Sequence, residues 1–398
     1  MQILKLAPEP VLKPWGLVHE GVMAASSIRV GVGELWLASA QTGPGNRSNS
    51  VVEPPLGGSL AAAVEQARAE GEDALLRMLG PGPVALLKES PYRGKTEAWH
   101  VRQVSGRTGL AAGPRTEEQK EGIGDLLRRG GLDARIEAWP AEVRELFGLI
   151  EPLEGGEVFL APAGTMHTMF AVGPESRLVI DEIQQGYGDC PMPTLSKILL
   201  VQDSLLSVQV HPDDRTVAAQ AAGELELEQD LAANPTVRIT DFGRRPGEHP
   251  ELGLRLTEVG AGLRRVRPAR VALECGGTLE FMVACPQFAK SRFTLPEGAR
   301  AALEPTYGSY RVLHCTGGAV RLAADGAEAH LAAGETAFVP AALESSLRLE
   351  AEGECSVFDD ALPDLGAVRA MLTERGASAL QVEALLDPPS ALASGGAT

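Results

Sequence analysis

The sequence is poor in aromatic side chains, in clusters of basic charge and in long apolar segments. Aromatic residues make up 4% of the 398 residues, the formal net charge is -17, and no run of lysine or arginine exceeds two residues. An acidic chain of this kind argues against nucleic acid and anionic membranes as partners. Nothing in it matches a signal peptide or an apolar run of about 18 residues, so we expect a cytoplasmic protein.

Cysteine is also scarce, and its spacing fits neither a thiolate metal site nor a disulfide framework. The five cysteines form no CxxC pair; they are Cys190, Cys275, Cys285, Cys315 and Cys355. An odd number of scattered cysteines disfavours both a disulfide framework and a thiolate zinc site. We therefore expect reduced and mostly buried thiols.

What the chain does have is a succession of short apolar runs separated by glycine, proline and aspartate. Strands are expected at 27–39, 84–88, 96–104, 157–163, 177–185, 197–202 and 205–210, and again from about residue 256 onward. Helical periodicity is confined to 59–79, 116–129, 140–150, 215–232 and 365–376. The pattern predicts a mainly β protein with satellite helices, and the length favours two domains.

An internal echo relates the two halves of the chain. Gly156 lies six residues before Pro162, and His167 lies five residues after that proline; Gly334 and Pro340 repeat the first interval. The second copy has Ser345 where the first has His167. This indicates two similar β units, of which the second lacks the histidine.

Three short segments carry polar side chains that can bind a ligand. In SVQVHPDD, residues 207–214, strand alternation puts Gln209 and His211 on one face. GKTEAWH, residues 94–100, likewise places Lys95 and Glu97 together, and the EIQQ segment offers Glu182. Each residue also has a structural interpretation. His167 alone reads equally well as a hydrogen-bonded core histidine, Gln209 as a cross-strand partner, and Asp213 and Asp214 as turn residues.

Together these segments resemble a known family. The GxxxxxPxGxxH pattern ending at His167 resembles the second conserved motif of the cupin superfamily. With GKTE, EIQQ and QVHPDD it closely resembles type I mannose-6-phosphate isomerases, which are cupins, over most of residues 14–255. The resemblance implies two cupin-type jelly-roll β-barrels. We expect a catalytic metal-binding domain at 1–255, a second, metal-free β domain at 256–363, and a C-terminal helix with a disordered tail at 364–398.

The order of the segments departs from the family pattern. In the family, the segment that matches KILLVQDSLLSVQVHPDD precedes the GKTE strand, whereas here it follows EIQQ. A hairpin closes its own hydrogen bonds along one edge, so it can enter the same place in a barrel from another loop. We expect an internal transposition of the QVHPDD hairpin that retains the geometry of the site.

The resemblance implies a metal centre. The family's metal ligands fall on Glu97, His167, Gln209 and His211, which offer one carboxylate, two imidazoles and one amide oxygen. Nitrogen and oxygen ligands suit one Zn²⁺ per chain, although another divalent metal is compatible. With a single anionic ligand, the ion keeps a net positive charge.

The resemblance also implies interconversion of mannose 6-phosphate and fructose 6-phosphate by proton transfer through a cis-enediol. Catalytic positions of the family fall on Lys95 and Arg238. Contacts to a small phosphorylated sugar are expected from Ser207 and Lys197, which match family positions near the phosphate and the pocket, and from Glu182, which would line the pocket from the EIQQ strand.

Two other functions remain open from the sequence. One is a catalytically inactive cupin that binds metal and sugar phosphate as a sensor or regulator. The other is a different cupin enzyme, such as a dioxygenase, which has no need of a phosphate pocket. The sequence leaves the base for the C2 proton open, and we expect a monomer or weak homodimer.

Overall fold

The computed structural model describes residues 1–17, 31–41, 49–89, 92–139, 141–187 and 190–388. Within them, three sheets are formed entirely from antiparallel pairs. The mainly β, antiparallel class predicted from the sequence is confirmed. Closure of these sheets into two jelly-roll barrels stays a prediction, as do the domain boundaries.

The largest sheet, called the site sheet below, runs in the order β13-β7-β5-β8-β9-β3-β2, with four further strands attached to β5, β8 and β11. Its strands are β2 (Glu9–Lys13), β3 (Gly31–Ala38), β5 (Glu97–Gly113), β6 (Gly148–Ile150), β7 (Val158–Ala161), β8 (Met166–Gln185), β9 (Thr194–Gln202), β10 (Ser204–Leu205), β11 (Val208–Val210), β12 (Val237–Thr240) and β13 (Arg264–Val266).

The other two sheets are built mainly from the last third of the chain. The second sheet contains β1 (Leu4–Ala7), β4 (Val51–Val52), β14 (Ala269–Ala272), β15 (Thr278–Cys285), β16 (Phe288–Leu295), β18 (Arg311–Gly317), β21 (Thr336–Val339) and β23 (Cys355–Ala361). The small sheet contains β17 (Arg300–Ala302), β19 (Ala319–Ala324), β20 (Ala327–Ala332) and β22 (Arg348–Ala351). Because β1 pairs with β21, the N-terminus completes a sheet of the C-terminal half.

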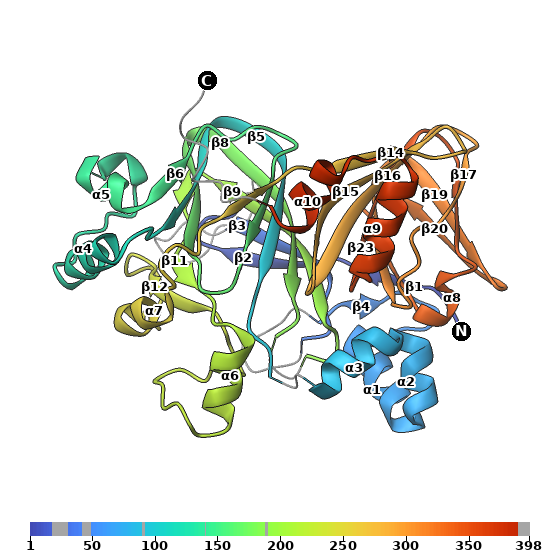
Figure 1. Ribbon diagram of the computed structural model, residues 1–398, viewed down its shortest axis with the longest axis horizontal. Helices are drawn as coiled ribbons and strands as arrows, with labels where there is room; N and C mark the ends of the chain where they lie inside the picture. Colours follow the sequence, from blue (N-terminus) through green and yellow to red (C-terminus); the bar gives the residue numbers. More distant parts are fainter. Residues whose placement is uncertain (18–30, 42–48, 90–91, 140, 188–189, 389–398) are drawn as a thin grey trace.

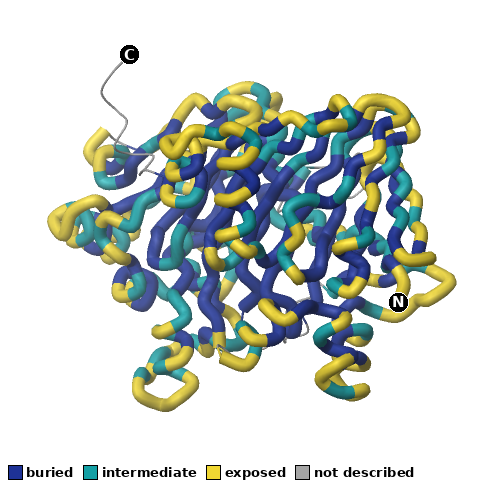
Figure 2. Tube along the Cα trace, turned by 45° about the vertical axis from the view of Figure 1, so that its right-hand side comes forward, coloured by how far each residue is buried: buried dark blue, intermediate teal, exposed yellow. Residues whose placement is uncertain are grey.

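Helices surround these sheets (Figure 1). They are α1 (Leu60–Glu70), α2 (Glu72–Leu79), α3 (Pro81–Glu89), α4 (Glu117–Arg128), η1 (Ile136–Ala138), α5 (Ala141–Leu146), α6 (Asp214–Ala221), α7 (Pro250–Leu256), α8 (Ala341–Glu344), α9 (Leu365–Glu374) and α10 (Ala379–Leu386). Figure 2 shows the buried chain concentrated in the strands, with exposed chain at turns and helices. No described helix is both long and apolar enough to cross a membrane.

Several local predictions were wrong in type or extent. Residues 84–88, expected as a strand, lie in helix α3, because a short run rich in alanine and leucine fits either structure and Pro81 starts a helix well. The helix expected over 59–79 is two helices that meet at Gly71, whose φ is 116°. The end of the helix expected at 140–150 is strand β6. Helix α6 ends at Ala221, well before residue 232.

The internal echo has a structural counterpart. Gly156 and Gly334 both adopt positive φ, at 93° and 92°, in turns that lead into β7 and β21. After each glycine, a glutamate carboxylate accepts a backbone N–H three residues upstream: Glu157 from Glu154 and Glu335 from Ala332. After β21 comes helix α8, whereas β7 leads into the strand that carries His167.

Alternation along β5 separates the two faces of the site sheet. Trp99 and Val101 pack in one hydrophobic core, and Ala98 packs in another core shared with the second sheet. His100 lies on that second face, where its Nδ1 is 3.0 Å from Oδ2 of Asp181 and its ring is 5.4 Å from that of Phe358. Glu97 lies two residues before Trp99 and therefore on the same face of β5, which directs it away from the second sheet.

The expected tail residues 389–398, and 27–30 of the first expected strand, lie outside the described residues.

Candidate metal centre and adjoining pocket

The structure brings Glu97, His167 and His211 together. One ligand atom from each lies within 4.8 Å of the others, and all three residues are buried. Glu97 begins β5, His167 lies at the start of β8, and His211 follows β11. Although 114 residues separate Glu97 from His211 in the sequence (211 minus 97), the chain returns them to one point.

The two imidazoles are oriented by backbone carbonyls. His167 donates from Nδ1 to the carbonyl of Thr165 at 2.9 Å, and His211 donates from Nδ1 to that of Pro235 at 3.2 Å. A carbonyl only accepts, so both rings carry a proton on Nδ1, and a neutral ring in this tautomer presents a lone pair on Nε2. Each Nε2 lies 3.4 Å from an oxygen of Glu97, and Nε2 of His211 has no hydrogen-bond partner among the described residues.

Gln209 completes the group. It is the register partner of His167 across β11 and β8, and its Nε2 lies 3.1 Å from Nε2 of His167. A turn of the amide exchanges its nitrogen and oxygen, so the same side chain can present Oε1 to the centre. The four residues that the resemblance named as ligands therefore meet at one place.

Protonation in this cluster matches what a cation requires. Burial, followed by the charge of Lys95, lowers the pKa of His211 to about 4, so its imidazole is neutral at pH 7. Burial opposes ionisation of Glu97, but the charge of Lys95 outweighs it and holds the pKa of Glu97 well below the usual range. A carboxylate with neutral imidazoles is the form that binds a divalent metal.

Hydrogen bonds hold the turn after β11 against the segment before β5. The N–H of Lys95 donates to the carbonyl of Pro212 at 3.1 Å, and that of Gly94 donates to Oδ1 of Asp214 at 2.8 Å. The same Oδ1 accepts from Nε2 of Gln185 at 2.9 Å. Asp213 caps α6. Sequence reasoning treated Asp214 only as a turn residue and missed this bridging role, since it depends on contacts about 120 residues apart.

A cavity of about 310 Å³ opens beside the cluster. Its lining includes all the predicted catalytic and substrate-binding residues, together with two of the predicted ligands: Lys95, Glu97, Glu182, Lys197, Ser207, Gln209 and Arg238. A cavity of this size suits a small polar metabolite. The lining also includes Gln184, whose buried amide atoms find no hydrogen-bond partner in the described part of the chain.

Lysines and carboxylates alternate along the inner wall. Lys95 contacts Oε1 of Glu97. Lys197 lies 3.1 Å from Oε1 of Glu182 and 3.7 Å from Oε1 of Glu34, and Lys13 lies 3.1 Å from the other oxygen of Glu34. Sequence reasoning missed Glu34. A charged residue inside the apolar run GVGELWLAS was the available signal.

The inner carboxylates differ in their acidity. Burial, followed by the negative charge of Glu97, raises the pKa of Glu182 to about 7, although Lys197 and Lys95 oppose this shift. Burial also disfavours ionised Glu34, but Lys197 and Lys13 outweigh it and lower its pKa to about 2. Attraction to Glu182, Glu34 and Glu97 exceeds the cost of burying Lys197 and raises the pKa of that lysine. Glu182 is therefore poised to exchange a proton near pH 7.

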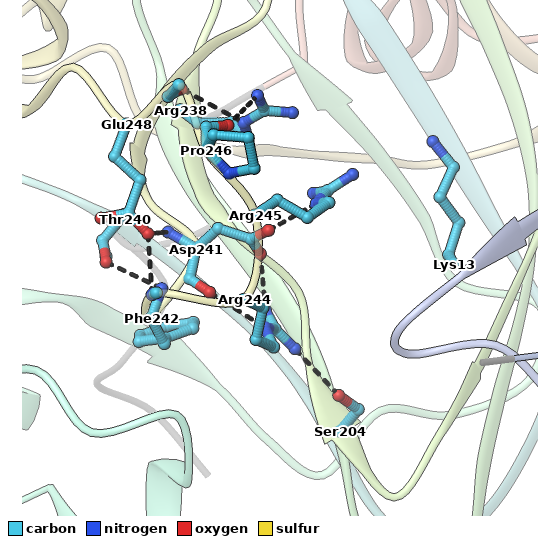
Figure 3. A network of polar contacts seen from close by, with 12 residues as sticks. Lys13, Ser204, Arg238, Thr240, Asp241, Phe242, Arg244, Arg245, Pro246 and Glu248 are labelled. Carbon is cyan, nitrogen blue, oxygen red and sulfur yellow. Dashed lines mark hydrogen bonds and ion pairs between the residues drawn. The ribbon is translucent and has the colours of Figure 1, made fainter. Parts of the chain in front are cut away.

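Arg238 lies on another wall of the cavity, in β12. Its Nη2 donates to the carbonyl of Pro246 at 2.8 Å and its Nε to that of Gly247 at 3.4 Å. It forms no ion pair with a described carboxylate. Its neighbour Arg244 instead pairs with Asp241 at 2.8 Å and donates to Ser204 at 3.3 Å (Figure 3).

Comparison with protein-family models and with curated proteins finds no match. Solved structures do match. Mannose 6-phosphate isomerase from Bacillus subtilis aligns with a TM-score of 0.52 at 14% identity, over 90% of this chain and 99% of that chain. The apo enzyme from Salmonella typhimurium aligns at 0.47 and 13%, and a mannose 6-phosphate isomerase bound with zinc and yttrium at 0.46 and 12%, each over 90% of this chain and 99% of the other. At such identities, the likeness to the Bacillus protein shows a shared fold.

Proposed function

We propose that this protein is a metal-dependent aldose–ketose isomerase that interconverts mannose 6-phosphate and fructose 6-phosphate. The observation that carries the proposal is the convergence of Glu97, His167 and His211, with Gln209 beside them, on a cavity lined with lysine and arginine. The fold shared with the Bacillus isomerase supports it. We further propose membership of the type I isomerases, with the QVHPDD hairpin transposed, and a catalytic domain at 1–255 separate from a metal-free β domain at 256–363.

The buried cluster fits a divalent cation. Nε2 of His211 faces Glu97 without a hydrogen-bond partner in the described chain, and an unpaired buried nitrogen of this kind is costly unless something binds it. Zn²⁺ is the ion that a set of two imidazoles, one carboxylate and one amide oxygen suits best. When bound there, it would stabilise negative charge on the substrate oxygens.

Side chains of the protein would transfer the proton and stabilise the charge that develops on the sugar. The reaction removes a proton from C2 of the open-chain aldose and returns one to C1, so it consumes no other reactant. We assign the proton transfer to Glu182, because it is buried in the cavity wall and its pKa is about 7. Lys197, 3.1 Å from Glu182, and Lys95, in contact with Glu97, would stabilise charge on the enediolate.

The other end of the sugar would lie against Arg238 and Ser207, which line the same cavity. Arginine suits phosphate because its guanidinium presents several N–H donors in one plane. The need for local cations is strong in a chain of net charge -17, which repels a phosphorylated sugar at long range.

A coupled assay with mannose 6-phosphate, run before and after chelation and with metal content measured in parallel, tests this function. We expect turnover that chelation abolishes and Zn²⁺ restores. Protein that holds stoichiometric metal and binds the sugar phosphate without turnover would instead identify a sensor. Oxygen consumption without isomerisation would identify an oxygenase.

A further inference from the structure

One histidine of the metal cluster is held by a loop. The Nδ1 atom of His211 donates to the carbonyl of Pro235 at 3.2 Å. Pro235 lies in the loop 222–236, a fully described stretch between α6 and β12 that contains no helix or strand (Figure 1). His167 differs, because the carbonyl that holds it belongs to Thr165, two residues away in the same segment. The orientation of His211 therefore depends on what fixes the loop.

The side-chain amide of Gln229 binds the carbonyls on either side of Pro235. Its Nε2 donates to the carbonyl of Asn234 at 2.5 Å and to that of Thr236 at 3.1 Å. Proline has no N–H, so the loop cannot be held through a backbone donor at position 235. Because a side-chain amide carries two N–H donors, a single glutamine can bind both flanking carbonyls. Gln229 thus fixes the segment whose middle carbonyl orients His211.

A second glutamine holds Gln229 in place. Gln220 of α6 donates from Nε2 to the backbone carbonyl of Gln229 at 2.6 Å, and its Oε1 accepts the N–H of Leu231 at 2.7 Å. Leu231 is fully buried, in the hydrophobic core that also contains Val217 of α6. The contacts therefore run from a helix and a packed core, through Gln229, to the carbonyl of Pro235.

The same loop forms part of the cavity wall. Ala233, Asn234 and Thr236 line the cavity beside the metal cluster. Two of these three residues are the ones whose carbonyls accept from Gln229. A displacement of the segment would therefore change the cavity wall and the orientation of His211 together. Gln229 itself belongs neither to the cavity lining nor to the group of candidate ligands.

We propose that Gln229 is a positioning residue, which holds the imidazole of His211 in its metal-binding orientation by fixing the carbonyl of Pro235. This inference rests on the metal centre of the proposed function, but not on the sugar or the reaction. Groups that orient a metal-binding histidine through its second ring nitrogen contribute about 10- to 100-fold to metal affinity. No substitution deletes a backbone carbonyl, so Gln229 is the side chain through which this support can be tested.

Two variants of similar size remove the hydrogen bonds. Gln229→Glu keeps the shape of the side chain but has no N–H to donate, and Gln229→Met keeps its length without polar atoms. We expect each variant to weaken Zn²⁺ binding by about 10-fold or more, measured by competition with a chelator in the absence of sugar. The melting temperature of the metal-free protein reports folding.

Gln119 of α4 provides the matched control. Its Nε2 also donates to a backbone carbonyl, that of Glu145 at 3.0 Å, and it lies outside the cavity lining. Gln119→Glu and Gln119→Met should leave the affinity for Zn²⁺ unchanged. Equal losses of affinity in the Gln119 and Gln229 variants would overturn the assignment, because they would show a general effect on the fold.

The imidazole of His211 gives a second measurement. In NMR spectra of the metal-free protein with isotope-labelled histidine, the Nδ1–H signal of His211 can be assigned by its absence from His211→Ala. We expect this signal to shift or broaden in both Gln229 variants, while the Nδ1–H signal of His167, which donates to Thr165, stays unchanged. An unchanged His211 signal, or normal Zn²⁺ affinity, in both Gln229 variants would overturn the assignment.

Gln220→Met extends the test to the residue that holds Gln229. It should weaken Zn²⁺ binding in the same direction as Gln229→Met. The double variant should lose less binding free energy than the sum of the two single losses, because both residues act on the same carbonyl. Fully additive losses would show that Gln220 and Gln229 do not act through one another.

Zn²⁺ binding and the histidine signal are both measured without turnover. Weaker Zn²⁺ binding in the Gln229 variants of a protein that does not isomerise the sugar would refute the proposed function and leave the positioning role intact. Turnover with unaltered Zn²⁺ affinity in these variants would do the reverse. A protein that binds no metal would refute the metal centre, and the Nδ1–H signal would still show whether Gln229 holds the ring of His211.

Discussion

At the scale of single residues, the site depends on which atoms carry protons. The backbone carbonyls of Thr165 and Pro235 fix the protons of His167 and His211 on Nδ1, so that both Nε2 atoms point at Glu97. Burial keeps His211 neutral, and nearby cations keep Glu97 ionised. These states are set before any ion binds, which reduces the cost of assembling a metal centre.

Replacing His211 with alanine should abolish stoichiometric zinc binding. The variant removes a proposed ligand, so affinity should fall by more than about 100-fold, the upper range for loss of a mere supporting residue. Metal content after dialysis measures this. His330→Ala is the control, because that histidine is exposed and remote from the cluster. Retention of one zinc per chain in the His211 variant would show that the ligand set is wrong.

Glu182→Gln should lower kcat by about 100- to 10,000-fold, since the amide cannot accept the C2 proton. Its similar size should leave zinc content and phosphate affinity unchanged. In the unmodified protein, a carboxylate with a pKa of about 7 acts as a base only when ionised, so kcat/KM should fall as the pH drops below 7. An unchanged kcat in the variant would exclude Glu182 as the base.

At the scale of elements, the central question is how the β11 segment reaches β5 and β8. Besides the pairing of β11 with β8, further bonds hold it: Gly164 N–H to the carbonyl of His211 at 2.7 Å, and the two bonds from Lys95 and Gly94 to the 212–214 turn. All of them involve backbone atoms. Their formation depends on close approach of the chain rather than on particular side chains, Asp214 excepted.

Gly94 is where this approach is tightest. A Cβ at Gly94 would lie 2.2 Å from the carbonyl oxygen of Pro212, so Gly94→Ala must push the turn away from β5. We expect a loss of about 1 to 3 kcal/mol in stability and weaker zinc binding, because His211 moves relative to Glu97. Chemical denaturation and zinc titration measure the two effects. Gly353→Ala, where a Cβ meets nothing within 4 Å, should change neither. Normal zinc affinity in Gly94→Ala would show that the contact between Gly94 and the 212–214 turn does not position His211.

Parts of the long strands could be predicted from the sequence, whereas helix α3 could not. Alternation and turn residues identified β7 and parts of β5, β8 and β9, because strands buried on at least one face keep a clear apolar pattern. Residues 84–88 show the limit of such patterns, since their assignment to α3 depends on packing against the rest of the chain. Lys88, for example, pairs with Glu72 of α2.

At the scale of the whole molecule, a polar layer that is buried except for Arg102 joins the two larger sheets. From the site sheet come His100, Arg102 and Asp181, and Ser196 donates to Asp360 of β23 at 2.6 Å. From the second sheet, Lys290 pairs with the same Asp360 at 2.8 Å. Buried charges of this kind are costly when left unpaired, so the layer favours one mutual position of the sheets.

His314 makes this layer sensitive to pH. It is 3% exposed, and burial, followed by the charge of Arg102, lowers its pKa from 6.5 to about 4, with Lys290 adding to this effect and Asp181 opposing it. The unfolded chain therefore takes up a proton at higher pH than the folded one. Stability should fall as the pH drops from 6.5 to 4, by about 3 kcal/mol for this residue.

Denaturant unfolding of the metal-free protein across this pH range tests the effect, with His314→Gln as the comparison. The variant should lose less stability on acidification because glutamine does not titrate. His330→Ala, which removes an exposed histidine, should lose as much free energy of unfolding on acidification as the unmodified protein. If the free energy of unfolding changes equally with pH in the unmodified protein and in His314→Gln, the layer tolerates the charged imidazole.

The sequence by itself determined the β class, the chemical types of the candidate ligands and their positions on or beside strands, because alternation and turn chemistry are local. Motif resemblance pointed to Glu97, His167, Gln209 and His211. Only the tertiary structure decided that these four meet, that Asp214 bridges Gly94 and Gln185, and that Glu34, Lys13 and Arg245 complete the cavity. The physical reason is that the sequence of a strand fixes which face of the sheet a polar side chain occupies, but not what that side chain contacts. Whether it faces a ligand, a partner or solvent depends on which distant segment folds against it.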